Sequence, residues 1–589
     1  MTNLEIAELL RAVAASYKLK DDKKNFFKIA AYERAADAVE HATSELKDLW
    51  DDGKLEDVPG IGPSMAEHLG ELFKTGKSKH FEEVMKGLPP SMFELMKVPG
   101  IGAKTGYRLA KELGVKSLGD LEKAAKQGKV SKLEGFGEES QSDILRSIEE
   151  TKGRTRRNLL PRAALIAGEV MDWISRDKNV KRADPLGSLR RQAATVGDID
   201  ISVATDNPKE VLEHFSKYPK AQRVLEKGTA SSSIIVPGDI QVDLMVQPSR
   251  SYGSLLQHFT GSKHHNIALR EYALKKGYSL SEYGIKKIKD KTGKVKTFET
   301  EEAFYRFLGL VWIPPEIRED TGEIEAAQKG GLPDLVELKD IKADLQIHSS
   351  FDIETSHDLG ESSMEEIVKK AGGLEYEYLA FTEHNPSQRG HTEKQSAEIL
   401  KKKQKKVEEL NYSISRGTKN SVKKVFNSLE IDILPDGRLP VSDEGLSFLD
   451  FALVSVHSSF GLERSAMTKR VLTALAHPKV KIFAHPTARK LNDREGIELN
   501  WPEIFEFCVK NNKWLEINAD PMRLDLPDTL VREAVKAGVK LTMGTDSHHK
   551  DGLNNMTFGI SVARRGWCEA GDIINTRSLS EFEKMLGGD

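Results

Sequence analysis

Carboxylates on two alternating segments are the first residues of this sequence that could do chemistry. Residues 197–203 (GDIDISV) and 239–246 (DIQVDLMV) both alternate polar and apolar side chains. In strands of this period Asp198 and Asp200 share one face, and Asp243 lies on the polar face of the second segment. If the strands are neighbours, three carboxylates form an oxygen cage suited to divalent cations. Either strand alone is equally well an ordinary amphipathic strand.

The residues just upstream favour a phosphate substrate over that ordinary interpretation. Residues 187–191 (GSLRR) place a glycine turn, a hydroxyl group and two guanidinium groups shortly before Asp198. Backbone amides, hydroxyls and arginine forks are the groups that bind a triphosphate. The whole arrangement resembles the nucleotidyltransferase palm, and its details resemble the family X DNA polymerases, which include DNA polymerase beta.

This resemblance implies roles for individual residues. Asp198, Asp200 and Asp243 would be catalytic and bind two Mg²⁺ ions, and Asp243 would help to deprotonate the primer 3′-hydroxyl. His258 stands where the family usually has tyrosine, and Gln241 where arginine is common. The residues implied for the nucleotide are Gly187, Ser188, Arg191, Gly197, His258, Phe259, Gly261 and Asn266, and the residue implied for the template strand is Arg270.

Near-repeats in the N-terminal region predict a DNA-binding element. Residues 58–62 and 98–102 both read VPGIG, and residues 133–137 (LEGFG) are a weaker third copy between helix-forming segments. In a helix-hairpin-helix the second helix points its first N–H groups at a DNA phosphate. One copy is equally a plain helix connector, but two near-identical copies favour DNA binding. The glycines predicted to contact DNA are Gly60, Gly62, Gly100 and Gly102.

In some family X members a lysine after the first hairpin removes a sugar phosphate through a Schiff base. His68 occupies that position here. An imidazole does not form the stable imine that an amine forms, so lyase activity is not expected unless another amine substitutes. The candidate amines are Lys23, Lys24 and Lys28.

Histidines are concentrated in the C-terminal part of the chain. Nine of the 16 lie in residues 340–589, and several follow short β-rich runs that are separated by helical segments. A single histidine at a strand end is usually structural. Five at this spacing, with aspartate and glutamate at matching ends, predict a parallel barrel whose mouth holds metal ions.

This part resembles the PHP phosphoesterase domain, a distorted (β/α)₇ barrel with a trinuclear metal site. Asp358 is favoured over Asp352 as the carboxylate that follows the opening motif, and Gln346 replaces one of the family's histidines, which predicts one weakly held metal. The resemblance implies a working hydrolase that uses Mn²⁺ and/or Zn²⁺. The implied ligands are His348, Asp358, His384, Glu430, His457, His485, Asp546 and His548.

The 589 residues are too many for one core, so a multidomain chain is expected. We predict a helical helix-hairpin-helix region, an α/β nucleotidyltransferase palm with a thumb, and the C-terminal barrel. The predicted boundaries are 1–85 for an N-terminal DNA-binding domain, 86–155 for a second helix-hairpin-helix domain, 156–250 for the palm, 251–325 for the thumb, 326–340 for a linker and 341–589 for the barrel.

The composition indicates where in the cell the protein acts and how it would contact DNA. Charged residues make up 30% of the chain, and no run approaches the ~20 apolar residues of a membrane span. The N-terminus lacks a signal-peptide pattern, and two cysteines form no disulfide framework, so a cytoplasmic, nucleoid-associated protein is expected. With a net charge of −3, DNA contacts must come from local basic patches such as residues 152–157. Residues 401–406 (KKKQKK) favour a solvated helix face, with DNA guidance as the minority alternative.

The combined resemblance implies a monomeric DNA polymerase that fills short gaps in gapped or primed duplex DNA with dNTPs. The barrel would supply Mn²⁺-dependent 3′ processing, as a 3′–5′ exonuclease, a 3′-phosphatase or an abasic-site endonuclease. One alternative is a DNA-end binding or bridging protein with weak or no catalysis, which the complete aspartate set opposes. Another is a nucleotidyltransferase for RNA or a small molecule, which the paired hairpins and residues 259–262 oppose.

Overall fold

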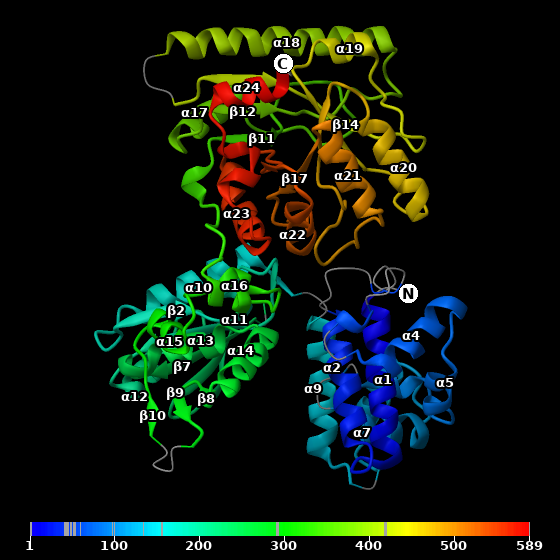
Figure 1. Ribbon diagram of the computed structural model, residues 1–589, viewed down its shortest axis with the longest axis vertical. Coiled ribbons are helices and arrows are strands. Elements are labelled where there is room, and N and C mark those ends of the chain that lie inside the picture. The colour runs from blue at the N-terminus through cyan, green and yellow to red at the C-terminus, as the bar shows by residue number, and fades with distance from the viewer. Residues whose placement is uncertain are drawn as a thin grey trace. The chain divides into compact units, whose positions relative to one another are not determined.

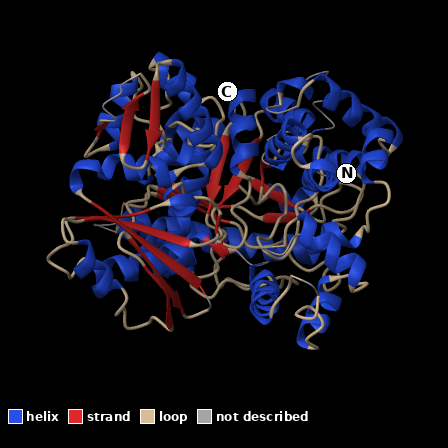
Figure 2. Cartoon of the chain, turned by 90° about the horizontal axis from the view of Figure 1, so that it is seen from below, coloured by secondary structure: helices blue, strands red, loops and turns tan. Residues whose placement is uncertain are grey.

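The structure is a computed structural model whose chain separates into two compact units, Met1–Arg156 and Arg157–Asp589 (Figure 1). The first unit contains only helices among its described residues, whereas the second contains all the described strands (Figure 2). The residues described are 3–40, 46, 50, 55–58, 61–96, 98, 101–133, 135–154, 157–238, 240–289, 294–417 and 421–587.

Two hydrophobic clusters hold the first unit together. One joins the apolar faces of α1, α2, α4 and α5, and the other joins α6 to α9 with two residues of α1, Ala15 and Leu19. The helices are α1 (Asn3–Asp21), α2 (Phe26–Glu40), α4 (Pro63–Thr75), α5 (Lys79–Met85), α6 (Ser91–Leu95), α7 (Ala103–Glu112), α8 (Leu118–Lys126) and α9 (Glu138–Arg154).

The three near-repeats of this unit share one turn geometry. In each, an apolar residue donates its amide to the carbonyl three residues earlier, and a helix begins two residues later. The helix starts predicted after the three near-repeats are therefore confirmed. The bonds run from Ile61 N to Val58 O, from Ile101 N to Val98 O and from Phe136 N to Leu133 O, each 3.0 Å long.

A five-stranded sheet in the order β2-β4-β7-β6-β5 forms the palm. The alternation seen in the sequence places Ile199, Ile201 and Val203 in the buried core against α10 and α12. The elements are β1 (Asn158–Leu159), α10 (Leu160–Ile174), β2 (Arg182–Pro185), α11 (Gly187–Arg190), β3 (Thr195–Val196), β4 (Ile199–Ala204), α12 (Pro208–Phe215), β5 (Arg223–Lys227), β6 (Ser231–Val236) and β7 (Ile240–Gln247).

The next segment packs on the palm through a buried ion network. Arg318 and Arg190 both donate to Glu301, each at 2.6 Å. Burial acts to raise the pKa of Glu301, but the two arginines outweigh it and lower that pKa to about 2. The elements are α13 (Tyr252–Thr260), α14 (Lys263–Lys275), β8 (Tyr278–Ser281), β9 (Gly284–Lys287), β10 (Val295–Lys296), α15 (Glu301–Leu308) and α16 (Glu323–Lys329).

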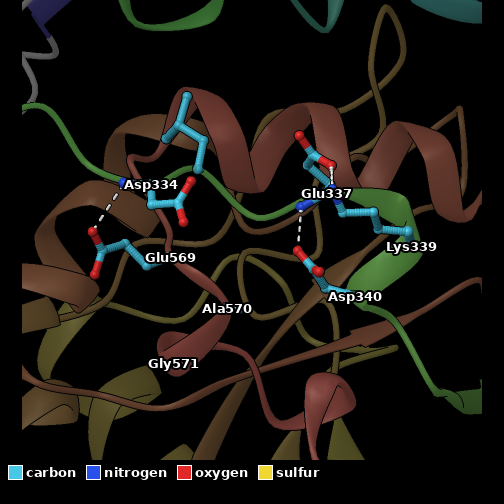
Figure 3. Close-up of a pocket in the computed structure, with 8 residues that line it drawn as sticks. Asp334, Glu337, Lys339, Asp340, Glu569, Ala570 and Gly571 are labelled. Carbon is cyan, nitrogen blue, oxygen red and sulfur yellow. Dashed lines mark hydrogen bonds and ion pairs between the residues drawn. The ribbon is translucent and has the colours of Figure 1, made fainter.

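The predicted linker, residues 326–340, is structured at both ends. Its first residues finish α16, and Gly330 ends that helix in the left-handed conformation with φ 69°. The amide of Val336 then donates to the carbonyl of Cys568 at 2.9 Å, and that of Asp334 donates to Glu569 at 3.0 Å (Figure 3). These hydrogen bonds therefore hold the end of the predicted linker against the edge of the barrel.

Seven parallel β segments close the C-terminal barrel. β13 and β14 follow each other with two residues between them and act as one bent segment, in line with the predicted distorted (β/α)₇ barrel. Closure is completed by parallel bridges between Ile347 and Ser547 and between His384 and Glu430. The strands are β11 (Ala343–Ile347), β12 (Tyr378–Phe381), β13 (Lys424–Asn427), β14 (Glu430–Asp432), β15 (Ala452–Ser455), β16 (Val480–Phe483), β17 (Trp514–Asn518) and β18 (Leu541–Gly544).

Helices cover the outside of this barrel (Figure 1). None of the described helices of the chain combines the length and apolar character that a membrane crossing requires. Cys508 and Cys568 are both buried free thiols. The helices are α17 (Met364–Gly373), α18 (Glu393–Arg416), α19 (Asp443–Ser447), α20 (Arg464–Leu475), α21 (Trp501–Asn511), α22 (Asp528–Ala537), α23 (Met556–Arg565) and α24 (Leu579–Gly587).

Candidate active sites

Three carboxylates converge on the palm sheet. Asp200 on β4 lies opposite Asp243 on the parallel strand β7, and Asp198 directly precedes β4. Burial raises the pKa of Asp200 to about 7, and the charges of Asp243 and Asp198 add to this shift. Carboxylates that repel one another in this way are suited to hold divalent cations.

Two of the glycines predicted to bind the nucleotide, Gly187 and Gly197, lie close to neighbouring side chains in this region. Gly187 has φ +56°, and a Cβ atom there would lie 2.9 Å from Oδ2 of Asp200. Any side chain would therefore displace the carboxylate, and Ser188 follows it directly in α11. The carbonyl of Gly197 accepts a 3.1 Å bond from the side-chain amide of Asn158, which fixes the turn before Asp198.

Gln241 takes the place of a cation beside the third carboxylate. Its Nε2 lies 3.0 Å from both oxygens of Asp243. The amide therefore orients the carboxylate as a hydrogen-bond donor, but it brings no positive charge to the cluster. Metal ions would have to supply that charge.

Arg191, a predicted triphosphate ligand, is held by a network that reaches the barrel. Its Nε donates to Glu319 at 2.9 Å and its Nη1 to the carbonyl of Thr260 at 2.6 Å. Arg565, at the end of α23, donates to the same Glu319 oxygen and to the Arg191 carbonyl, both at 2.9 Å. Burial acts to raise the pKa of Glu319, but Arg565 and Arg191 outweigh it and lower that pKa to about 2.

Most of the predicted sugar and base contacts gather where α13 meets α14. His258 and Phe259 lie edge to face with ring centres 4.8 Å apart, and Asn266 donates to the His258 carbonyl at 2.7 Å. Burial lowers the pKa of His258, and nearby Arg270 lowers it further. Gly261 has φ +70° and lies against Arg191, while Arg270 is exposed.

The hairpins leave open space at their helix starts. A Cβ atom at Gly62 or Gly102 would meet no atom of the described residues within 4 Å, so another backbone can approach closely there. Gly60 and Gly100, the other two predicted contacts, lie outside the described residues. Among the described residues, no side chain caps the start of α4 or α7, which leaves first-turn amides for a phosphate, although Pro63 at the start of α4 has no N–H to offer.

His68, at the position where some relatives carry a lyase lysine, lies in a cluster of rings. It stacks on His80 with ring centres 4.1 Å apart, and Tyr17 hydrogen-bonds the His80 imidazole at 3.0 Å. Among the alternative amines, Lys28 lies over the Tyr17 ring at 5.1 Å. The expectation about lyase activity stays a prediction.

The barrel brings most of its predicted ligands to one end. Glu430 lies at the centre of this group. Its carboxylate is 2.8 Å from Nε2 of His485, and it is 3.3 Å from Nε2 of both His457 and His348. His348 is also 3.1 Å from Asp546. Four groups of three residues could each hold a metal ion: His348, His384 and His548; His357, His384 and His457; Glu430, His457 and His485; and His348, Glu430 and Asp546.

Several of these histidines have a buried ring nitrogen that is available to bind a cation. These atoms have no hydrogen-bond partner among the described residues, although buried polar atoms are normally satisfied. Burial lowers the pKa of His384 to about 3, so its imidazole is neutral and able to bind a metal. The unsatisfied atoms are Nδ1 of His348, His384 and His485, and Nε2 of His548.

Two residues of this centre were missed by the sequence analysis. His357, and not Asp358, enters the candidate groups; Asp358 is exposed at the rim of the cavity, and Asp352 is exposed as well. Asp432 orients two rings, at 2.8 Å from Nε2 of His357 and 2.7 Å from Nδ1 of His457. Asp358 lines the same cavity as these groups, and its role as a ligand stays a prediction.

Gln346 stands where the family has a further histidine, and both polar atoms of its side-chain amide form hydrogen bonds. Its amide nitrogen donates to Glu430 at 2.8 Å, and its oxygen accepts a 3.4 Å bond from Asn518. Asn518 also donates to Asp546 at 3.1 Å and to Glu516 at 3.2 Å. Amides thus orient the carboxylates on this side of the centre in place of an imidazole ligand.

Comparison with known proteins places the whole chain. It is 35% identical to DNA polymerase/3′-5′ exonuclease PolX of Bacillus subtilis (strain 168), over 100% of this chain and 99% of that protein. The chain belongs to the family X DNA polymerases of the PolX type. DNA polymerase lambda of Rattus norvegicus is 24% identical over 54% of this chain and 56% of its own length, and that of Arabidopsis thaliana is 27% identical over 54% and 62%.

Three family models match successive parts of this PolX-type chain. A helix-hairpin-helix domain matches residues 1–78, a SAM-like helix-hairpin-helix tandem matches residues 92–150, and the DNA polymerase beta thumb matches residues 255–319. The thumb match covers α13, α14 and α15, where His258, Asn266 and Arg270 lie. Along the sequence, the two helix-hairpin-helix matches thus precede the three carboxylates and the thumb match follows them.

Proposed function

We infer that this chain is a DNA-directed DNA polymerase that fills short gaps during DNA repair, and that its barrel is a 3′–5′ exonuclease. The observation that carries the polymerase assignment is the register of β4 and β7, which sets Asp200 opposite Asp243 beside Asp198. The full-length similarity to a PolX protein supports both activities.

In the palm, Asp198, Asp200 and Asp243 would hold two Mg²⁺ ions. Those ions supply electrostatic stabilisation of the phosphoryl transfer. Asp243, oriented by Gln241, accepts the proton of the primer 3′-hydroxyl, whose oxygen attacks the α-phosphorus of the dNTP while pyrophosphate leaves. Arg191 and the Gly187–Ser188 turn bind the triphosphate, His258 to Gly261 border the sugar and base, and Arg270 contacts the template.

In the barrel, the histidines and carboxylates around Glu430 would hold Mn²⁺ and/or Zn²⁺, which lower the pKa of water and offset phosphate charge. Water adds to the phosphorus of the terminal phosphodiester and the bond to the preceding 3′-oxygen breaks. That oxygen takes up a proton, so a nucleoside 5′-monophosphate and a shorter strand with a 3′-hydroxyl result. The same hydrolysis of a P–O bond would release inorganic phosphate from a 3′-phosphate, as a 3′-phosphatase, or break a phosphodiester at an abasic site, as an abasic-site endonuclease.

The helix-hairpin-helix unit supports gapped or primed duplex DNA as the partner, bound through backbone amides at the helix starts. A monomer in the cytoplasm, associated with the nucleoid, fits this activity. A DNA-end bridging protein without catalysis is the second candidate function, since the hairpins alone would serve it.

A one-nucleotide-gapped duplex with or without a 5′-phosphate at the gap tests the proposal. The polymerase assignment predicts Mg²⁺-dependent insertion of one templated nucleotide, and a bridging protein predicts none. Mn²⁺-dependent shortening of a 5′-labelled strand from its 3′ end tests the barrel in the same protein. An absence of insertion in correctly folded protein that still binds the duplex would favour bridging.

A further inference from the structure

A helix of the barrel, α23, contacts the short loop that joins α11 to β3 in the palm. This loop, residues 191–194, begins with Arg191, the predicted triphosphate ligand. The contact joins residues 369 positions apart in the sequence. Local sequence rules do not produce it, so we examine what it does for the palm.

Backbone hydrogen bonds tie the loop to the Gly187–Ser188 turn. The amide of Arg191 donates to the carbonyl of Gly187 at 3.2 Å, and that of Ala193 donates to the carbonyl of Ser188 at 2.9 Å. Between them, Gln192 has φ 57°, in the left-handed region that residues other than glycine adopt only when their surroundings hold them there. A shift of the loop would therefore move the turn that is predicted to bind the triphosphate.

Ser561 on α23 supports the left-handed residue of the loop. Its hydroxyl is buried and donates to Oε1 of Gln192 at 2.9 Å. The same hydroxyl lies 3.0 Å from the carbonyl of Thr557, the acceptor that a serine within a helix commonly uses. Because Thr557 alone would satisfy the hydroxyl, α23 does not need Gln192, whereas Gln192 gains a fixed partner from α23.

Arg565 on the same helix holds the backbone of the loop. Its Nη1 lies 2.9 Å from the carbonyl of Arg191 and 2.9 Å from Glu319, which also accepts from Nε of Arg191. Asp528 fixes Nε of Arg565 from the barrel side at 2.7 Å. Ala194, at the end of the loop, packs against the hydrophobic core of the barrel. Both the main chain and the side chain of Arg191 are thus held from the barrel.

We propose that α23 is part of the polymerase centre, with Ser561 and Arg565 as positioning residues. They hold loop 191–194, and through it the Gly187–Ser188 turn, in the conformation that receives the triphosphate of a dNTP. The proposal rests on the proposed nucleotide site of the palm. A loop that is held in its binding conformation costs less to order when the ligand arrives, so the expected benefit is in nucleotide affinity.

Two variants remove the same hydrogen bond from its two ends. Ser561→Ala deletes the donor, and Gln192→Asn shortens the acceptor while keeping a residue that tolerates the left-handed conformation. Each should raise KM for dTTP at a one-nucleotide gap about threefold to fivefold, with kcat within about twofold, because one neutral hydrogen bond is lost. The double variant should be no worse than either single variant.

Thr557→Ala is the matched control, because it deletes an exposed hydroxyl one turn earlier on α23. It should leave KM for dTTP within about 1.5-fold of the parent. Inorganic tripolyphosphate, as a competitive inhibitor of dTTP, carries no base or sugar. Its Ki should rise with KM in Ser561→Ala and Gln192→Asn, since the loop holds the phosphate side of the site. Shortening of a 3′ end by the barrel should stay within about twofold in all three variants.

Unchanged KM and Ki in both variants, in a parent that inserts nucleotides, would overturn the positioning role of α23. Equal losses in Thr557→Ala, or parallel losses of duplex binding and 3′ processing, would also overturn it, because they indicate general loosening. Calorimetric binding of α,β-imido-dTTP to the complex with gapped duplex keeps the two proposals distinguishable. A parent that bound this analogue without inserting dTTP would overturn the polymerase function, and the Kd values of the variants would still decide the role of α23.

Discussion

The palm and the barrel build their metal-binding sites in opposite ways. The palm gathers three carboxylates from two neighbouring strands, and their mutual repulsion and burial raise the pKa of Asp200 to about 7. In the barrel, burial acts to raise the pKa of Glu430, but the surrounding histidines hold it well below its usual range. The palm therefore depends on cations to relieve repulsion, whereas the barrel is already organised by internal pairs.

This difference predicts that the palm holds an exchangeable metal site and the barrel a preassembled one. A cluster of like charges binds cations that come and go with the substrate, as a triphosphate brings its own magnesium. A cluster of paired histidines and carboxylates keeps its geometry between turnovers. The following predictions either separate the two sites or show that they act together.

The largest effect is expected in the palm. Asp243→Ala removes one of three carboxylates and should lower nucleotide insertion at least about a thousandfold, because positioned metals supply several kcal/mol of transition-state stabilisation. Affinity for the gapped duplex, measured by fluorescence anisotropy, should stay within about threefold because the hairpins are untouched. Insertion close to the parent rate would refute the palm assignment.

A mutation in the barrel should remove 3′ processing alone, and a mutation in the palm should remove gap filling alone. His485→Ala removes a partner of Glu430 in the barrel and should lower Mn²⁺-dependent 3′ processing about a hundredfold or more, while gap filling stays within about twofold. Asp198→Ala should do the reverse. Loss of polymerisation by folded His485→Ala protein would contradict the separation of the two sites.

The palm site should also be the more sensitive to pH near neutrality. Asp200 has a pKa raised to about 7, so it is protonated below that pH and must lose a proton before it binds a cation. Mg²⁺ affinity should therefore fall about tenfold between pH 8 and pH 6. Calorimetric titration of His485→Ala protein, with Asp200→Asn as the control, measures this; a flat profile would contradict the shift.

Arg565 provides a smaller and more selective probe, because it joins the sites. Arg565→Ala leaves Glu319 to Arg191 alone, so this arginine is drawn from the triphosphate, and KM for dNTP should rise about fivefold with little change in kcat. Arg564→Ala is the matched control, since Arg564 pairs with Glu316 instead. Equal effects of the two variants would indicate general loosening of the interface.

The smallest expected effect concerns sugar choice. His258 replaces the usual tyrosine, and we predict weaker exclusion of ribonucleotides than a tyrosine would give. His258→Tyr should raise the ratio of kcat/KM for dGTP over GTP a few-fold, about 1 kcal/mol or less. Backbone around Gly261 also borders this region, so an unchanged ratio would assign the discrimination to the backbone.

Regular features of both regions could be predicted from the sequence because they follow local rules. The alternation around Asp200 and Asp243 sets which face is polar whatever the strands pair with, and repeated glycine turns fix the helix starts. Histidines at strand ends predicted the barrel for the same reason. Parallel strands carry their C-terminal ends to one rim.

The remaining features depend on contacts between distant residues. The loop that carries His357 and Asp358 has no period, so its fold, which brings His357 to Asp432, could not be predicted from spacing. Lys403 belongs to a lysine run that indicates a solvated face, yet it is fully buried and pairs with Glu383 at 2.5 Å. Its ammonium group also donates to the carbonyls of Phe381 and Ser428, and these partners, distant in the sequence, explain its burial.

The helix α23 limits how freely this protein can be recombined. It begins soon after His548 and ends at Arg565, its Ser561 bonds Gln192, and its Phe558 packs against the palm core as well as the barrel core. Just beyond it, Trp567 is buried in the hydrophobic cluster of residues 269–335. A chimera joined at Gly330 would replace one side of these contacts while α23 stays in the barrel core, so the halves of two PolX relatives should exchange cleanly only where the residues that α23 and Trp567 contact in the polymerase half are the same.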